Sequence, residues 1–127
     1  MTLRTTLPVF ATVLTLCALP AAAHHSTAMF DFQKTVTLTG TVKDFQWTNP
    51  HTWTNVTVQG SKGTAVYGLE GMSPNYLSRN GWSRKTLQPG DTVTVEVHPL
   101  KDGRKGGFMV SAKLADGTVL YNLPRRQ

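Results

Sequence analysis

The chain has 127 residues, of which 39% are hydrophobic, and this is enough for one domain with one modest core. Its 13 Lys and Arg residues outnumber 7 Asp and Glu residues, which gives a formal net charge of +6. The basic residues are scattered among segments that read as loops, a distribution more typical of solvated loops than of a nucleic-acid surface. We therefore expect no nucleic-acid partner.

Residues 1–23 have the three-part layout of a secretory signal. Arg4 gives a basic start, "VFATVLTLCAL" is an apolar core, and residues 21–23 (Ala-Ala-Ala) form a small-residue cleavage site. An uncleaved anchor is the less favoured alternative, because the apolar run is short for a membrane span. We expect cleavage after Ala23, a periplasmic or secreted protein without a membrane span, and a mature chain that has lost its single cysteine, Cys17.

The expected mature chain has three parts, an N-terminal segment over residues 24–34, a β-barrel over 35–123 and a basic tail over 124–127. Alternation of apolar and polar residues, the period of a strand, predicts strands at 35–43, 51–58, 64–70 and 92–98. Residues 106–123 predict a hairpin through Asp116-Gly117, with Phe108, Val110, Ala112 and Leu114 as its buried set. Gly40 predicts a bulge or a sharp coil in the first strand.

One short helix is predicted over residues 73–81. Ser73 suits the N-cap, Pro74 the first helical position and Gly81 the exit from the helix. Three strands, a helix and further strands is the order of an OB-type barrel. We predict an all-β fold, a small OB-like barrel of five to six strands with one helix between strands three and four. A small β-sandwich is the alternative.

All four histidines, His24, His25, His51 and His98, lie in the expected mature chain. Cleavage after Ala23 would give His24 a free α-amine beside its imidazole, and this pair can chelate Cu(II) in two in-plane positions. A third nitrogen would complete a copper site. His51 and His98 are better candidates for it than His25, which would have to bend back through the intervening peptide.

Structural roles for the same histidines are at least as well supported by the sequence. His24 and His25 can belong to a loose exported terminus. His51 can hydrogen-bond a turn carbonyl, and His98 can be a solvated edge residue. Copper binding is therefore one hypothesis, and its candidate ligands are His24, His51, His98 and His25.

Aromatic residues form a second group around Asn49-Pro50-His51. Trp53 has the opposite phase to Val56 and Val58, so either this strand buries both faces or Trp53 stands on an exposed platform. Exposed aromatic side chains on this face of an OB barrel stack on sugars or bases, although aromatics in small barrels are more often core. The candidate ligand-binding residues are Trp47, Trp53, Asn49 and Arg84.

No enzyme motif is present. The chain has no His-Glu-x-x-His helix, no Gly-x-Ser-x-Gly turn, no glycine-rich phosphate loop and no carboxylate pair at a recognisable spacing. We therefore expect no enzymatic activity.

Four segments, "HHSTAMFD", "VTLTGTVKDFQWTNPH", "SPNYLSRNGW" and "LQPGDTVTVEVHPLKDGRKGG", cover nearly the whole mature chain. In them the chain resembles a family of small exported bacterial proteins that is known as a domain of unknown function. Its motifs fall on Phe45, Trp47, Asn49, Pro50 and His51, and on Gly90, Asp91, Val93, Val95, His98 and Pro99. Thr27 departs from the family pattern, which has an aromatic residue after His-His-Ser. The resemblance implies a periplasmic protein and no established activity.

Three hypotheses remain open from the sequence. The chain is a periplasmic copper-binding protein, a metal-free OB-type module that binds an anionic or aromatic ligand, or a structural envelope protein. Its expected partners are a metal ion or small ligand and an unidentified periplasmic protein. Copper-binding predicts that His24, His51 and His98 converge, whereas ligand-binding predicts that Trp47 and Trp53 are exposed and bordered by basic residues.

Overall fold

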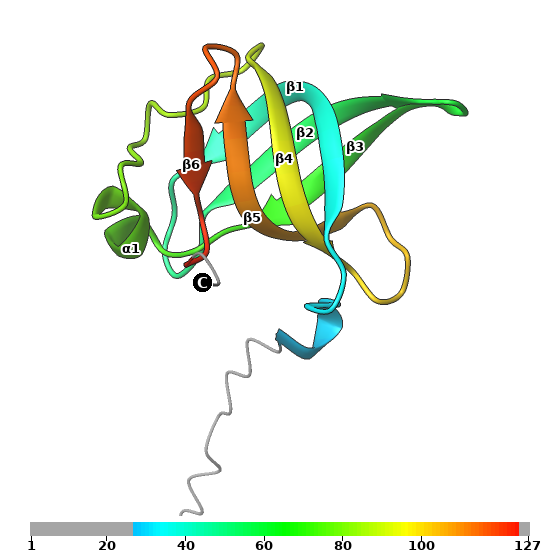
Figure 1. The fold of residues 1–127 in the computed structure, drawn as a ribbon, viewed down its shortest axis with the longest axis horizontal. Coiled ribbons are helices and arrows are strands. Elements are labelled where there is room, and N and C mark those ends of the chain that lie inside the picture. The colour runs from blue at the N-terminus through cyan, green and yellow to red at the C-terminus, as the bar shows by residue number, and fades with distance from the viewer. Residues whose placement is uncertain (1–26, 125–127) are drawn as a thin grey trace, which may run out of the picture.

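The computed structural model describes residues 27–124 of the chain (Figure 1). The predicted signal segment, His24, His25 and the last three residues of the predicted tail lie outside the described residues. Within the described part, no helix combines the length and the apolar character that crossing a membrane requires.

Six strands and two short helices make up the described chain. They are η1 (Thr27–Met29), β1 (Val36–Gln46), β2 (Trp53–Gly60), β3 (Gly63–Glu70), α1 (Pro74–Ser78), β4 (Thr92–Pro99), β5 (Gly106–Leu114) and β6 (Val119–Tyr121). The strands follow the order β3-β2-β1-β4-β5-β6, and a parallel pairing of β3 with β5 closes the barrel (Figure 1). The predicted OB-like barrel, with its helix between the third and fourth strands, is confirmed.

Strand β1 coils sharply and belongs to both halves of the barrel. Its first half, 36–41, pairs with β4, and its second half, 41–46, pairs with β2. A Cβ at Gly40 would collide with the carbonyl oxygen of Thr57, so the close approach of β2 requires glycine there. The predicted coil at Gly40 is confirmed, whereas the bulge lies later in the strand, between Val42 and Asp44.

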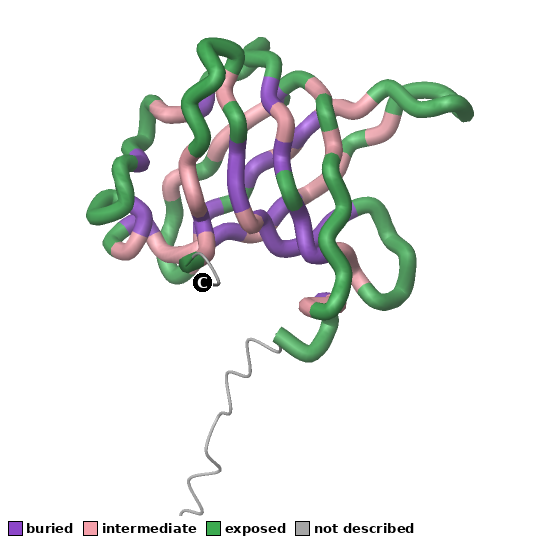
Figure 2. Tube along the Cα trace, in the orientation of Figure 1, coloured by how far each residue is buried: buried purple, intermediate pink, exposed green. Residues whose placement is uncertain are grey.

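The core fills the barrel and is closed at one end by the segment around α1. Figure 2 shows the buried residues (purple) gathered along β4 and β5 and at the start of α1. Leu77 of α1 is fully buried and joins Trp82 and Leu87 in the core cluster. Ser73 caps the helix by accepting a hydrogen bond from the Tyr76 N–H at 3.3 Å.

The helix ends at Ser78, three residues earlier than predicted. The backbone N–H groups of Asn80 and Trp82 both donate to the Leu77 carbonyl oxygen, at 2.9 and 3.1 Å. Gly81 lies between these two donors, and its φ of 85° reverses the chain so that the Trp82 N–H reaches back to the last turn of the helix, as predicted for the helix exit.

The predicted buried set of β5 is confirmed at Ala112, which lies in the core cluster, and is wrong at Val110. Pairing with β4 shifts between Glu96 and Val97, so that Val97 faces Met109 while Glu96 faces Ser111, and Val110 is the extra residue of a bulge. Met109, 1% exposed, therefore takes the place in the core that strict alternation assigns to Val110. Val110 is only half-buried, and Phe108 is buried outside the core cluster, against Phe30.

Candidate functional site

The connection between β1 and β2 is held firmly against the residues that follow β3. The Thr48 hydroxyl donates to the His51 carbonyl oxygen at 2.8 Å, which closes the turn on itself. Both the backbone N–H and the hydroxyl of Thr52 donate to the Met72 carbonyl oxygen, at 3.2 and 3.0 Å. The turn therefore presents the side chains between these anchors in a fixed arrangement.

The imidazole of His51 is oriented by the end of β3. Its Nδ1 lies 2.8 Å from the Gly71 carbonyl oxygen. Because a carbonyl only accepts, Nδ1 carries the hydrogen and donates, and in the neutral ring Nε2 is the nitrogen with the lone pair. The same Nδ1 lies 3.4 Å from Oε1 of Glu70, whose side chain is 14% exposed. A carbonyl and a carboxylate thus face one side of the ring.

Trp53 begins β2 on the outer face of the barrel. In register it lies between Gln46 of β1 and Glu70 of β3. It is 41% exposed, whereas Val56, on the opposite face of β2, is fully buried. Of the two sequence-based alternatives, the exposed platform is the one that the structure shows.

These side chains surround one small pocket of about 140 Å³, which we call the loop pocket. Its lining residues are Thr48, Asn49, Pro50, His51, Trp53 and Glu70. The pocket brings together three predicted site residues, Asn49, His51 and Trp53. It adds Glu70, which the sequence reasoning missed. The two predicted strands pair as a hairpin, and recognising its two-residue turn at Ser61-Lys62 would have placed Glu70 opposite Trp53.

His98 lies elsewhere, at the end of β4. Its Nδ1 donates to the Lys34 carbonyl oxygen at 2.6 Å, and its ring meets Phe32 edge-on with 5.1 Å between the centroids. It pairs across the sheet with Phe108, which pairs in turn with Glu70. Within residues 27–124, no group of three His, Cys, Asp or Glu side chains is placed to hold a metal ion.

The other two predicted ligand residues do not line the loop pocket. Trp47 is half-buried and packs edge-on against Phe45, with 5.8 Å between the ring centroids. Arg84 is exposed in the connection between α1 and β4. The expected basic border is not seen among residues 27–124, since no Lys or Arg of this part lines the loop pocket.

Comparisons with known proteins give a family but no activity. A search of the curated proteins and a search of the solved structures found no match. One family profile matches residues 12–110, which is most of the chain and includes every residue of the loop pocket. The chain therefore belongs to DUF6152, a family of unknown function.

Proposed function

We propose that this protein is a binding protein, exported to the periplasm or secreted, that recognises a neutral carbohydrate at the loop pocket. The observation that carries the proposal is the meeting of an exposed indole with polar side chains around one pocket. OB barrels use this region, the outer face of strands two and three with the loop before strand two, to bind oligosaccharides and oligonucleotides.

The chemistry of the loop pocket matches the two surfaces of a pyranose ring. The C–H face of a sugar is apolar and packs on the electron-rich face of an indole, which Trp53 offers at 41% exposure. Sugar hydroxyls donate to carboxylates and amide oxygens and accept from amide N–H groups, and Glu70 and Asn49 supply both kinds of partner. A small polar pocket beside an aromatic platform therefore fits one sugar unit of a longer chain.

Charge favours a neutral sugar over a nucleic acid at this place. Binding single-stranded nucleic acid requires Lys or Arg along the phosphate backbone, and none lines the loop pocket. The Glu70 carboxylate would repel a phosphate. The basic residues that raise the net charge to +6 lie in other parts of the chain.

The test is a titration with three neutral trisaccharides, chitotriose, cellotriose and maltotriose, followed by NMR shifts of the Trp53 indole N–H. We expect at least one to bind and Trp53→Ala to weaken it about tenfold, the equivalent of about 1.4 kcal/mol. Val66→Ala is the matched control, because Val66 is 42% exposed on the outer face of neighbouring β3. Equal affinity of Trp53→Ala and Val66→Ala, or binding of a thymidine hexanucleotide in place of the sugars, would contradict the proposal.

Copper is the second candidate ligand, with the amine and imidazole of His24 and the ring of His51 as donors. The observation that supports it is the orientation of His51. Histidines that bind metals usually donate their other ring N–H to a carbonyl or a carboxylate, and His51 has both beside Nδ1. When bound, copper would supply an electrophilic centre, and the donors that these two histidines offer to it are neutral nitrogens.

A Cu(II) titration of the secreted protein, with its terminus verified by mass spectrometry, separates the two candidates. We expect one-to-one binding that is lost when one extra residue precedes His24 and is weakened about tenfold or more in His51→Gln. Trp53→Ala is the control and should bind copper normally. Binding that is indifferent to the extra residue would end the copper hypothesis and leave the carbohydrate proposal untouched.

A further inference from the structure

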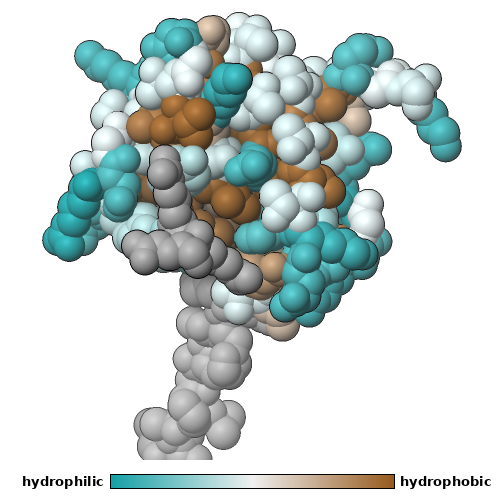
Figure 3. Space-filling model, viewed as in Figure 1, coloured by the Kyte–Doolittle hydropathy of each residue, from teal (hydrophilic) through white to brown (hydrophobic). Residues whose placement is uncertain are grey.

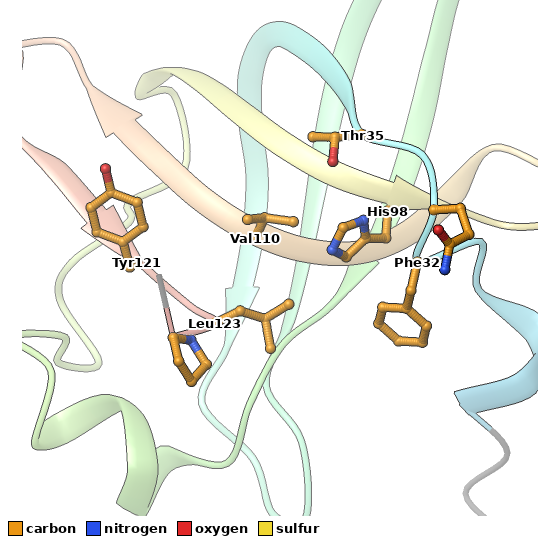
Figure 4. A pocket seen from close by; sticks show the side chains of 8 residues that line it. Phe32, Thr35, His98, Val110, Tyr121 and Leu123 are labelled. Atoms are coloured by element: carbon orange, nitrogen blue, oxygen red, sulfur yellow. The ribbon is translucent and has the colours of Figure 1, made fainter. Parts of the chain in front are cut away.

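A second and larger hollow lies on the face of the barrel that carries β4, β5 and β6. It has a volume of about 730 Å³, within the range of small-molecule sites. We call it the His98 groove; its main lining residues are Phe32, Thr35, His98, Val110, Tyr121 and Leu123. Figure 4 shows these side chains around the groove, and Figure 3 shows apolar side chains gathered on the same face. Among residues 27–124, none of the residues that line it is Lys, Arg, Asp or Glu.

The fold builds this groove with two devices. The bulge in β5 turns Val110 out of the core and into the floor of the groove. The Val110 carbonyl oxygen then accepts hydrogen bonds from the backbone N–H groups of Asn122 and Leu123, at 2.8 and 3.1 Å. On the other side, the Asp31 N–H donates to the Pro99 carbonyl oxygen at 2.8 Å and fixes the segment that carries Phe32. Both walls are therefore tied to the barrel.

His98 supplies a polar atom in a groove whose lining is mainly apolar, with polar groups also from Gln33, Thr35 and Tyr121. The residue is 9% exposed, and its hydrogen bond to the Lys34 carbonyl oxygen is made by Nδ1. Nε2 has no such bond with any residue that the structure describes. Because the described chain leaves no buried side-chain nitrogen or oxygen without a partner, Nε2 is accessible from the groove (Figure 4).

The tautomer decides what Nε2 can bind. Nδ1 donates to a carbonyl, so Nε2 of the neutral ring is an acceptor. A pure hydrocarbon would cover this lone pair without satisfying it, which costs affinity. Beside the neutral ring, a carboxylate would lose its water next to a second acceptor, and no Lys or Arg is among the described residues that line the groove. A hydroxyl attached to an apolar body satisfies both the atom and the walls.

We propose that the His98 groove is a second binding site that takes an aromatic alcohol of the phenol class. The ring system lies between Phe32 and Val110, and the hydroxyl donates its hydrogen to Nε2 of His98. This site shares no lining residue with the loop pocket and does not rest on the carbohydrate proposal.

Three naphthalenes of the same shape test the proposal on the full-length protein. 2-Naphthol carries the donor, 2-methoxynaphthalene lacks it, and 2-naphthoate replaces it with an anion. NMR shifts of the Val110 amide and the His98 ring nitrogens report binding. We expect 2-naphthol to bind about fivefold more tightly than 2-methoxynaphthalene, the advantage that one net hydrogen bond gives. The large shift of the His98 Nε2 resonance that a hydrogen bond causes should appear only with 2-naphthol.

Two variants separate the hydrogen bond from the groove itself. His98→Phe should bind 2-naphthol and 2-methoxynaphthalene equally. Val110→Trp changes a half-buried side chain and fills the floor, so it should weaken both ligands more than about tenfold even if His98→Phe fails to fold. Val66→Ala, outside both the groove and the loop pocket, should bind them normally. Equal binding of the two neutral ligands to the unaltered protein, tighter binding of 2-naphthoate, or no effect of Val110→Trp would overturn the proposal.

Discussion

His51 and His98 are fixed in the same way and surrounded differently. Each donates Nδ1–H to a backbone carbonyl, at 2.8 Å to Gly71 and 2.6 Å to Lys34. Nδ1 of His51 also lies 3.4 Å from Oε1 of Glu70, in a small polar pocket. His98 instead meets the Phe32 ring, in a groove with about five times the volume of the loop pocket. The shared backbone contact sets the tautomer, and the neighbouring side chains decide which ligand each ring can serve.

Gly71 lies beside His51 and Gly107 lies beside His98, and substitutions of these two glycines should have the largest effects on stability. A Cβ at Gly107 would collide with the His98 carbonyl oxygen and with Cγ1 of Val97, and a backbone carbonyl in a strand pair cannot move aside. We expect Gly107→Ala to lower the free energy of unfolding by about 3 kcal/mol, since overpacking of this kind costs about 1–3 kcal/mol. Thermal unfolding would show it as a fall in Tm of more than about 10 °C.

At Gly71 the collision is with two side chains, the hydroxyl of Thr52 and the amide of Asn122. Side chains yield more easily than backbone, so Gly71→Ala should cost about 1–2 kcal/mol and weaken the loop pocket more than the groove. Gly60→Ala, where a Cβ meets nothing closer than 3.4 Å, is the control and should unfold normally. A larger loss of stability in Gly71→Ala than in Gly107→Ala would show that the two sites are supported differently from this account.

Asn122 joins the two regions and should affect both. It is 1% exposed, and its Oδ1 accepts a hydrogen bond from the Met72 N–H at 2.8 Å, while the next residue, Leu123, lines the groove. Asn122→Ala leaves the Met72 N–H without its partner, which costs about 1–2 kcal/mol. Chemical denaturation measures the loss, and hydrogen exchange should speed up at Met72 and Leu123 together. Faster exchange on one side alone would mean that the two regions are not coupled here.

The smallest effect on stability is expected at the turn between β5 and β6, where the contribution of Asp116 depends on pH. Hydrogen bonds from Thr118, chiefly its backbone N–H at 2.8 Å, lower the pKa of Asp116 below its usual 3.8. The charged carboxylate therefore stabilises the turn fully above pH 3.8, and this contribution is lost as the pH falls through the folded-state pKa. Asp116→Asn should be slightly less stable than the unaltered protein at pH 6, with the difference shrinking at pH 3. A constant difference across both pH values would contradict this role.

The loop pocket could be predicted largely from the sequence because its residues are close together in the chain. Asn49, His51 and Trp53 lie close together at one turn. Because Trp53 is out of phase with Val56, the sequence already indicated that its side chain could be exposed. The His98 groove could not be predicted, because its walls come from segments far apart in the chain. Its floor exists only because a bulge shifts Val110 out of phase, and strict alternation gives no sign of an extra residue. His98 was identified as a candidate, but its apolar neighbours were not.

One NMR experiment tests most directly whether the barrel carries two separate sites. The protein is titrated first with the best-binding trisaccharide and then, in the same tube, with 2-naphthol. We predict that the sugar moves the Trp53 indole resonance without moving the Val110 amide, and that 2-naphthol then moves the Val110 amide and the His98 Nε2 resonance while the Trp53 shift stays at its sugar-bound value. Displacement of the sugar by 2-naphthol, or a sugar response at Val110 as large as that at Trp53, would contradict the account of two sites.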